Sequence, residues 1–250
     1  MNLVVYVDAG HGPDTPGKRS PDGSLREHFF NHATAVMLMG ALTEYEDVTV
    51  VQTYNHAEDT PLKARTDKAN AMFVNDRAKI QSGDEKQIFI SIHANAMTNE
   101  WTDHAGIETW VYTEPSNESL NLASHVQNRL IRNTGRKNRG VKRGNLHIVR
   151  ETQMPAILVE SGFMTNREEC ELLKTKEYQQ LIATSIEQGI ADVYGIKKKA
   201  ETTPPKAPDQ EPSAIYKVQV GAFSLRENAE RMVSDLKKKG ITAIITKEDE

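Results

Sequence analysis

Three groups of polar residues in this 250-residue chain each follow directly on a short apolar run. The runs and their groups are residues 4–7 with 8–12, residues 88–92 with 93–95, and residues 156–159 with 160–163. The carboxyl ends of parallel strands meet at one edge of a sheet, so His11, His93 and Glu160 are expected to converge there. Two histidines and a glutamate at such an edge are typical of a zinc hydrolase, whose three protein ligands leave the fourth position to water.

Each of these residues also has an ordinary structural explanation. A lone His11 or His93 would more often be a hydrogen-bonded structural histidine. Both follow predicted buried strands and have glycine or alanine neighbours, however, which favours a metal site. Glu160 is harder to explain in that way, because a carboxylate at the end of a buried strand is costly unless it is paired, bound to metal or used in chemistry.

The third zinc ligand is expected from residues 24–32, which open the first predicted helix. Glu27 is the leading candidate. Ser24 followed by Glu27 three positions later is also a capping-box pattern, and the spacing leaves both roles open. His28 and His32 stand four residues apart and form a second candidate metal pair, although surface histidines are the commoner explanation of an isolated pair.

Arg65 and His147 are weaker candidates for a role in the site. Arg65 is either a helix-surface residue or a brace for a site carboxylate, and the structural role is favoured. His147 lies in an alternating run that predicts a strand, so packing is favoured over a position facing the cleft. Residues 119–150 contain many Arg and Lys and no Asp or Glu, which indicates a solvated face or, alternatively, a positive rim for an anionic polymer.

The elements that must position these residues alternate along residues 1–195. Short runs rich in β-branched or aromatic residues predict strands, and the longer amphipathic stretches between them predict helices. The predicted strands are 3–7, 48–54, 87–92, 106–112 and 156–159, and the predicted helices are 24–44, 60–81, 117–134 and 176–194. This alternation predicts an α/β fold with a mainly parallel sheet flanked by helices.

The end of the chain has a different composition. Residues 196–213 are rich in proline and have almost nothing to bury, so they are predicted to be a linker. Residues 214–250 predict a small βαβ unit, with strands 215–223 and 241–246 around helix 224–240 and Gly240 as its C-cap. The predicted organisation is therefore a catalytic domain over 1–195, a linker and a C-terminal module.

Composition excludes several classes of protein. A net charge of −4 argues against a nucleic-acid binder that depends on overall charge, and no apolar run approaches the length of a membrane span, so neither partner is expected. Cys170 is the one cysteine, which excludes a disulfide within the chain and a cysteine-built zinc site. Its neighbours predict a buried helix residue rather than a nucleophile.

Four motifs, taken together and in this order, resemble the zinc-dependent N-acetylmuramoyl-L-alanine amidase family, which bacterial autolysins and phage endolysins use. The motifs are residues 8–12, Glu27 with Asn31, residues 91–95 and residues 155–166. The resemblance covers residues 1–195 and implies a twisted sheet flanked by helices. It also implies one zinc ion held by His11, Glu27 and His93, with Glu160 as the catalytic glutamate. Residues 75–86 depart from the pattern by lengthening one connection.

The roles of other matching residues are less defined by the resemblance. Asn31 and Asn95 also match motif positions. Asn95, Arg65 and His147 are the candidates for substrate binding. The implied reaction is hydrolysis of the amide between N-acetylmuramic acid and L-alanine in peptidoglycan. The alternatives are another zinc peptidase or deacylase acting on cell-wall peptides, and a non-catalytic wall-binding regulator.

Residues 216–223 resemble the opening of sporulation-related (SPOR) repeats, which bind peptidoglycan, and correspond to one half of the usual module. Such a unit can pair with a second copy as a homodimer, dock on residues 1–195 or stay partly disordered until it meets the wall, and pairing fits best. Residues 1–8 predict a strand rather than a signal peptide. We therefore expect synthesis in the cytoplasm without a signal peptide and action on the wall after lysis or assisted release.

Overall fold

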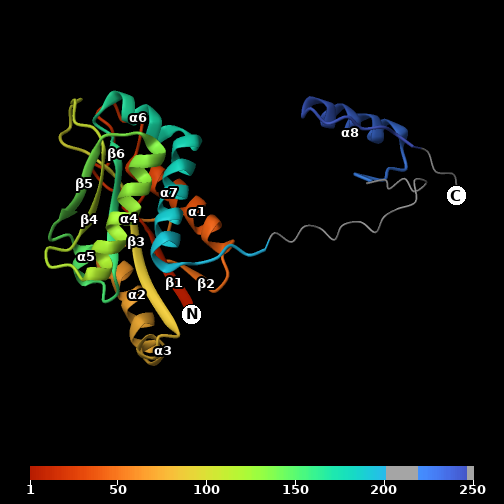
Figure 1. Ribbon diagram of the computed structural model, residues 1–250. Helices are drawn as coiled ribbons and strands as arrows, with labels where there is room; N and C mark the ends of the chain where they lie inside the picture. The colour runs from red at the N-terminus through yellow and green to blue at the C-terminus, as the bar shows by residue number, and fades with distance from the viewer. Residues whose placement is uncertain (201–218, 247–250) are drawn as a thin grey trace. The chain divides into compact units, whose positions relative to one another are not determined.

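The computed structural model describes residues 1–200 and 219–246, which belong to two separate compact units (Figure 1). The first unit is built on a sheet of six strands in the order β2-β1-β3-β6-β4-β5. Their bounds are β1 Asn2–Ala9, β2 Val48–Gln52, β3 Glu85–Asn95, β4 Ile107–Val111, β5 Asn138–Arg143 and β6 Ala156–Phe163. Every neighbouring pair is parallel except β4 and β6, which confirms the predicted mainly parallel sheet.

Helices cover both faces of this sheet, as the alternation predicts. The helices are α1 Glu27–Thr43, α2 Leu62–Asn75, α3 Arg77–Ser82, α4 Asn117–Thr134, α5 His147–Glu151, α6 Arg167–Lys174 and α7 Lys176–Tyr194. The larger core packs α1, α4 and α7 against one face, for example through Leu38, Val126 and Ile186. The smaller core packs α2 and α5 against the other face through Ala69 and Ile148.

The three central strands are the ones that sequence pattern predicts best. In β1, all seven residues from Leu3 to Ala9 are buried, and β6 has only Glu160 partly exposed. A strand that is buried on both faces has a nearly continuous apolar sequence, because neither face is exposed to water. The polar residues that interrupt these runs, Asp8, Ser91 and Glu160, therefore lie inside the protein or at its functional edge.

The structure differs from the sequence-based expectations in three places. Residues 147–151 form the short helix α5 and not a strand, because Ile148 and Val149 pack together onto the smaller core, which an alternating strand could not arrange. The strand β5 at Asn138–Arg143 is not predicted, because it is an edge strand of mostly charged and polar residues with Val141 as its one apolar side chain. The predicted helix 60–81 is divided at Asp76 into α2 and α3.

The described part of the second unit consists of α8, Arg226–Lys238, with extended segments on either side. Gly240 follows the helix at φ +76°, and Ile241 N–H donates to the Leu236 carbonyl at 3.0 Å, so the expected C-cap is present. Residues 219–223 and 241–246 form no strand, because a strand needs a hydrogen-bonding partner that they lack among the described residues. The rest of strand 215–223 and most of the linker lie outside the described residues.

In residues 1–200 and 219–246, every helix is too short or too polar to cross a membrane.

Candidate active site and metal centre

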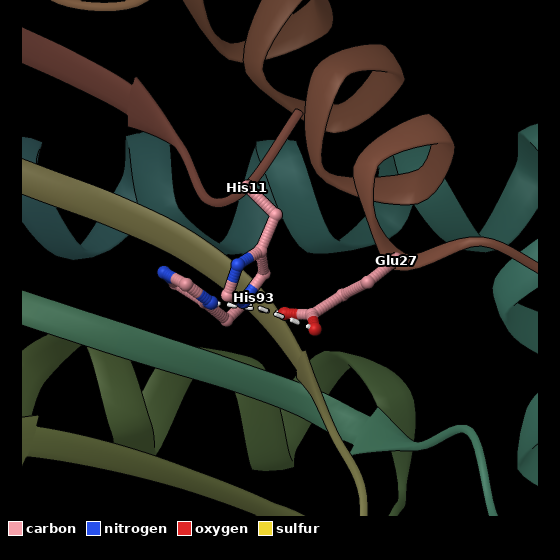
Figure 2. Close-up of side chains that lie close together, drawn as sticks. All are labelled: His11, Glu27 and His93. Atoms are coloured by element: carbon pink, nitrogen blue, oxygen red, sulfur yellow. Dashed lines mark hydrogen bonds and ion pairs between the residues drawn. The ribbon is translucent and has the colours of Figure 1, made fainter. Parts of the chain in front are cut away.

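His11, Glu27 and His93 come together at the carboxyl edge of the sheet (Figure 2). His11 belongs to the loop after β1, Glu27 to the first turn of α1 and His93 to β3. One Glu27 oxygen, Oε2, lies 3.2 Å from His11 Nε2, and the other, Oε1, lies 2.9 Å from His93 Nδ1. One ligand atom from each of the three side chains lies within 4.8 Å of the others.

The backbone before His11 is shaped by this close approach. A Cβ atom placed on Gly10 would lie 2.0 Å from Cε1 of His93, so only glycine leaves room for the His93 ring. His11 itself has φ +63°, in the left-handed region that residues other than glycine rarely adopt. Strained backbone of this kind persists only where the surroundings hold it in place, and it gathers at functional sites.

Arg65 on α2 is the group that holds the His11 loop. Its Nη1 donates to Asp8 Oδ1 at 2.8 Å and to the carbonyl of Ala9, and its Nη2 donates to the carbonyl of His11 at 3.1 Å. The side chain is 1% exposed. Arg65 is therefore not the helix-surface residue favoured from its sequence context but the alternative, a buried brace for the site through Asp8, and it has no exposed surface with which to contact a substrate.

Glu27 is placed by its helix but does not cap it. The N-cap position of α1 is Arg26, no side chain makes a capping hydrogen bond there, and Ser24 bonds to Asp22 instead, so the capping-box alternative is wrong. Ala94 N–H and the Asn31 amide both donate to Glu27 Oε1, at 3.2 and 3.4 Å. Burial disfavours the charged carboxylate, but the hydrogen bonds from His11 and His93 outweigh it and lower the pKa of Glu27.

Glu160 lies beside this group. It is directly opposite His93 in the parallel register of β3 and β6, so the two side chains are on the same face of the sheet. Its Oε2 atom is buried and has no hydrogen-bond partner among the described residues. Burial chiefly, helped by the negative charges of Glu27 and Glu108 and opposed by His93, raises the pKa of Glu160 to about 8.

Glu108 on β4 lies on the other side of Glu160 from His93, because it is opposite Glu160 in the antiparallel register of β4 and β6. It is 3% exposed and accepts hydrogen bonds from Asn95 Nδ2 at 2.9 Å, Trp110 Nε1 at 3.1 Å and Arg139 Nε at 2.7 Å. The Asn95 amide oxygen accepts from Ala96 N–H, so both ends of this candidate substrate-binding side chain already have protein partners. The sequence pattern gives no sign of this contact between Asn95 and the buried carboxylate of Glu108.

The remaining histidines are not part of the metal-ligand group. Both ring nitrogens of His28 face backbone carbonyls, of His11 at 3.3 Å and His56 at 3.1 Å. His32 Nδ1 lies 2.9 Å from the Tyr54 hydroxyl, so the candidate pair at positions 28 and 32 is used in packing rather than directed at one point. His147, at the start of α5, lies 3.4 Å from Thr66 Oγ1 and is half-buried.

Four of the eight Arg and Lys residues in the basic stretch 119–150 form ion pairs within the protein. Arg129 pairs with Asp192, Arg136 with Glu168 and Glu169, and Arg150 with Glu151. Arg139 pairs with Glu108. The other four, Arg132, Lys137, Lys142 and Arg143, make no ion pair with the described residues, so the stretch combines structural ion pairs with unpaired positive charges.

The donor set of the site fits a divalent metal. Two imidazole nitrogens and a carboxylate are the ligands that zinc accepts in open catalytic sites. The buried and unpartnered Oε2 atom of Glu160 is the kind of polar group that a water beside such an ion would satisfy. With such an ion bound, the site would hold a water next to a carboxylate able to take its proton.

Two family models match the chain. The model described as N-acetylmuramoyl-L-alanine amidase matches residues 5–192, and the model described as SPOR domain matches residues 212–250.

Curated relatives and a solved structure agree with these matches. The chain is 28% identical over 248 residues to the sporulation-specific N-acetylmuramoyl-L-alanine amidase of Bacillus subtilis (strain 168), covering 99% of this chain and 86% of that protein. It is 29% identical over 224 residues to the endolysin of Bacillus phage SPP1, covering 87% and 76%. The crystal structure of an N-acetylmuramoyl-L-alanine amidase from Clostridium difficile 630 matches with a TM-score of 0.67 and 31% identity, over 76% of this chain and 96% of that one.

Proposed function

Since this chain belongs to the N-acetylmuramoyl-L-alanine amidase family, we propose that it hydrolyses the amide between N-acetylmuramic acid and L-alanine of peptidoglycan with one zinc ion. His11, Glu27 and His93 would hold the ion, and Glu160 would act as the general base. The observation that supports this assignment best is the convergence of the three donor groups, with Glu160 opposite His93 on the next strand.

Each residue has a defined part in the reaction. When bound, zinc supplies Lewis acidity, which makes water a stronger nucleophile near neutral pH and polarises the amide carbonyl. Glu160 takes the proton of the attacking water at its carboxylate and then delivers a proton to the departing amine of L-alanine. One carboxylate beside the attacking water is suited to both roles, because the proton that it takes in the first step is available for the departing amine in the second.

The scaffold limits the movement of these groups. His93 and Glu160 are on central strands, and Arg65 holds the loop that carries His11. Asn31 donates to the Gly10 carbonyl at 3.0 Å and to Glu27, so it ties the first turn of α1 to the same loop. Catalytic groups on rigid elements need little reorganisation as the reaction proceeds.

The experiment that tests the proposal is lysis of purified cell walls, followed by turbidity. The protein as purified should clear the suspension. Removal of the metal with a chelator should abolish clearing, and addition of one equivalent of Zn²⁺ should restore it. Clearing that persists after complete metal removal would show that zinc is not required, and a protein that holds zinc but never clears walls would be a wall-binding regulator.

The second unit belongs to the SPOR domain family and is expected to add affinity for peptidoglycan. In its described part, Val220, Leu225, Ile241 and Ile244 are all more than half exposed, and α8 has no buried residue. A unit with this much exposed apolar surface gains stability from a partner. We propose that a second copy of the unit supplies it; a protein that stays monomeric at micromolar concentrations in light scattering would contradict this pairing.

The route to the wall is also a proposal. Residues 2–9 form the buried strand β1 of the central sheet. We propose that the protein is made in the cytoplasm and reaches its substrate after lysis or with a separate release aid. Efficient secretion of this chain alone through the general export pathway would contradict that route.

A further inference from the structure

His93, Glu160 and Glu108 lie opposite one another on neighbouring strands, and the guanidinium of Arg139 lies next to Glu108. Glu108 is opposite Glu160, and Arg139 on the edge strand β5 donates from Nε to Glu108 Oε2 at 2.7 Å. Neighbouring strands lie about 4.8 Å apart, so a guanidinium held at Glu108 lies within roughly 10 Å of Glu160. Arg139 is therefore close enough to contact a substrate whose scissile bond lies beside Glu160.

The guanidinium of Arg139 is held in place by its two neighbours. Glu108 binds its Nε, and its Cζ lies 4.8 Å from the centroid of the buried Phe163 ring. Glu108 is itself fixed by hydrogen bonds from Asn95 and Trp110. This arrangement orders the long side chain before any ligand binds, which lowers the entropy lost on binding.

Arg139 still has hydrogen-bonding capacity. Its two terminal amino groups make no hydrogen bond or ion pair with the residues the structure describes, and the side chain is 25% exposed. The other paired arginines of this part of the chain differ: Arg129 and Arg136, for example, each bind carboxylates through two nitrogens. Two parallel N–H groups of a guanidinium match the geometry of a carboxylate, and such pairs are among the strongest hydrogen bonds in proteins.

We infer that Arg139 binds a free carboxylate on the stem peptide of the substrate and makes the enzyme prefer that form over the carboxamide. An extended peptide advances about 3.3 Å per residue, so a group roughly 10 Å from the scissile amide belongs to the second or third residue of the peptide. This inference rests on the proposed function and adds a specificity-determining residue to it.

A purely structural role for Arg139 would have a different consequence. If its task were only to neutralise Glu108, replacing it would change stability and the cleavage of all substrates alike. A carboxylate contact changes the ratio of kcat/KM between two substrates that differ in one group, and most of that change is in KM. This ratio is therefore the quantity to measure.

The test uses the full chain with zinc and two matched pairs of soluble muramyl peptides. In one pair, the second residue of the peptide has a free carboxylate or a carboxamide; in the other pair, the third residue differs in the same way. Wild-type protein should prefer the carboxylate form in at least one pair by roughly 10- to 100-fold in kcat/KM, as expected for a charge-assisted hydrogen bond. Arg139→Gln should bring that ratio close to one.

Two further variants separate the possible causes. Arg139→Lys keeps the positive charge beside Glu108 and so protects folding. One ammonium group cannot replace the two terminal amino groups of the guanidinium, however, so most of the preference for the carboxylate substrate should disappear. Lys18→Gln removes an exposed cation that also acts on Glu160, and it should retain the wild-type ratio. Equal cleavage of both forms by wild-type protein, or equal loss of preference in Lys18→Gln and Arg139→Gln, would overturn the inference. Cleavage of neither form would instead count against the proposed function.

Discussion

His93 on β3 and Glu160 on β6 occupy directly opposite positions in the register of two parallel strands at the centre of the sheet. A candidate metal ligand and a candidate general base are thus separated by one strand spacing, about 4.8 Å, and are fixed by backbone hydrogen bonds. Glu27 joins them from the first turn of α1, and His11 joins them from the loop after β1 (Figure 2). The distance between base and metal is therefore set by the sheet itself.

Replacement of Glu160 by Gln should leave zinc content and melting temperature close to wild type but reduce wall lysis by about 10²- to 10⁴-fold, the usual contribution of a general base. Glutamine has nearly the same shape and cannot accept the proton of water. The measurement is the turbidity rate at equal zinc occupancy. A rate close to wild type would assign the base elsewhere, and Glu108 is the next carboxylate to test.

Replacement of Gly10 by Ala should displace the His93 ring, because the new Cβ would lie 2.0 Å from Cε1 of that ring. We expect zinc binding to weaken by at least about 10-fold, in the range seen when the geometry of a metal ligand is disturbed. The matched control is Gly40→Ala in α1, where an added Cβ meets nothing within 4 Å and should stabilise the helix slightly. Equal zinc affinity in the two variants would show that the close contact at Gly10 does not constrain the site.

Arg65→Ala should be strongly destabilising, because it removes the positive charge paired with the buried Asp8 carboxylate and the donor to the Ala9 and His11 carbonyls. Asp8 would keep only the hydroxyl donors of Thr53 and Ser91. Breaking a buried ion pair in this way typically costs about 3–5 kcal/mol. The measurement is the free energy of unfolding in denaturant. Arg129→Ala, which removes a partly exposed pair with Asp192, should cost about 1 kcal/mol or less. If the two variants lost similar stability, the His11 loop would not depend on Arg65.

Removal of residues 201–250 should leave hydrolysis of small soluble muropeptides intact and weaken binding to whole cell walls. The cut is placed after Ala200 because Lys199 N–H donates to the Glu44 carbonyl at 2.7 Å and Lys198 pairs with Tyr45, so residues 197–200 belong to the catalytic unit. Co-sedimentation with purified walls measures the effect. Undiminished binding by the shortened protein would remove the targeting role of the second unit.

The sequence pattern was sufficient to predict the central strands of the sheet. The strands β1, β3 and β6 are apolar on both faces, and each polar group that follows them is located at the carboxyl edge, as the pattern predicts. Glu27 could not be assigned from spacing, because the same residues match a capping box. The family resemblance implied the metal role, and the uncapped start of α1 and the contacts of Glu27 with His11 and His93 agree with it.

Other features could not be read from local pattern. The strand β5 is polar because it lies at the edge of the sheet, so neither the strand nor the pairing of Arg139 with Glu108 has a sequence signal. The run 146–149 alternates as a strand would, but it folds as the start of α5, because packing against the sheet overrides a four-residue preference. In the second unit, the alternation at 241–246 is real, but the described residues offer it no strand to pair with.

The end groups released from peptidoglycan identify the bond that this protein cleaves. Purified walls are digested with the zinc-loaded protein and, in parallel, with protein from which the metal has been removed, and the soluble products are identified by mass spectrometry. Zinc-dependent amidase activity should yield stem peptides with a free L-alanine amino terminus and glycan strands whose muramic acid has a free lactyl carboxylate, in the zinc-loaded digest alone. New ends within the peptide, or the same products without metal, would contradict it.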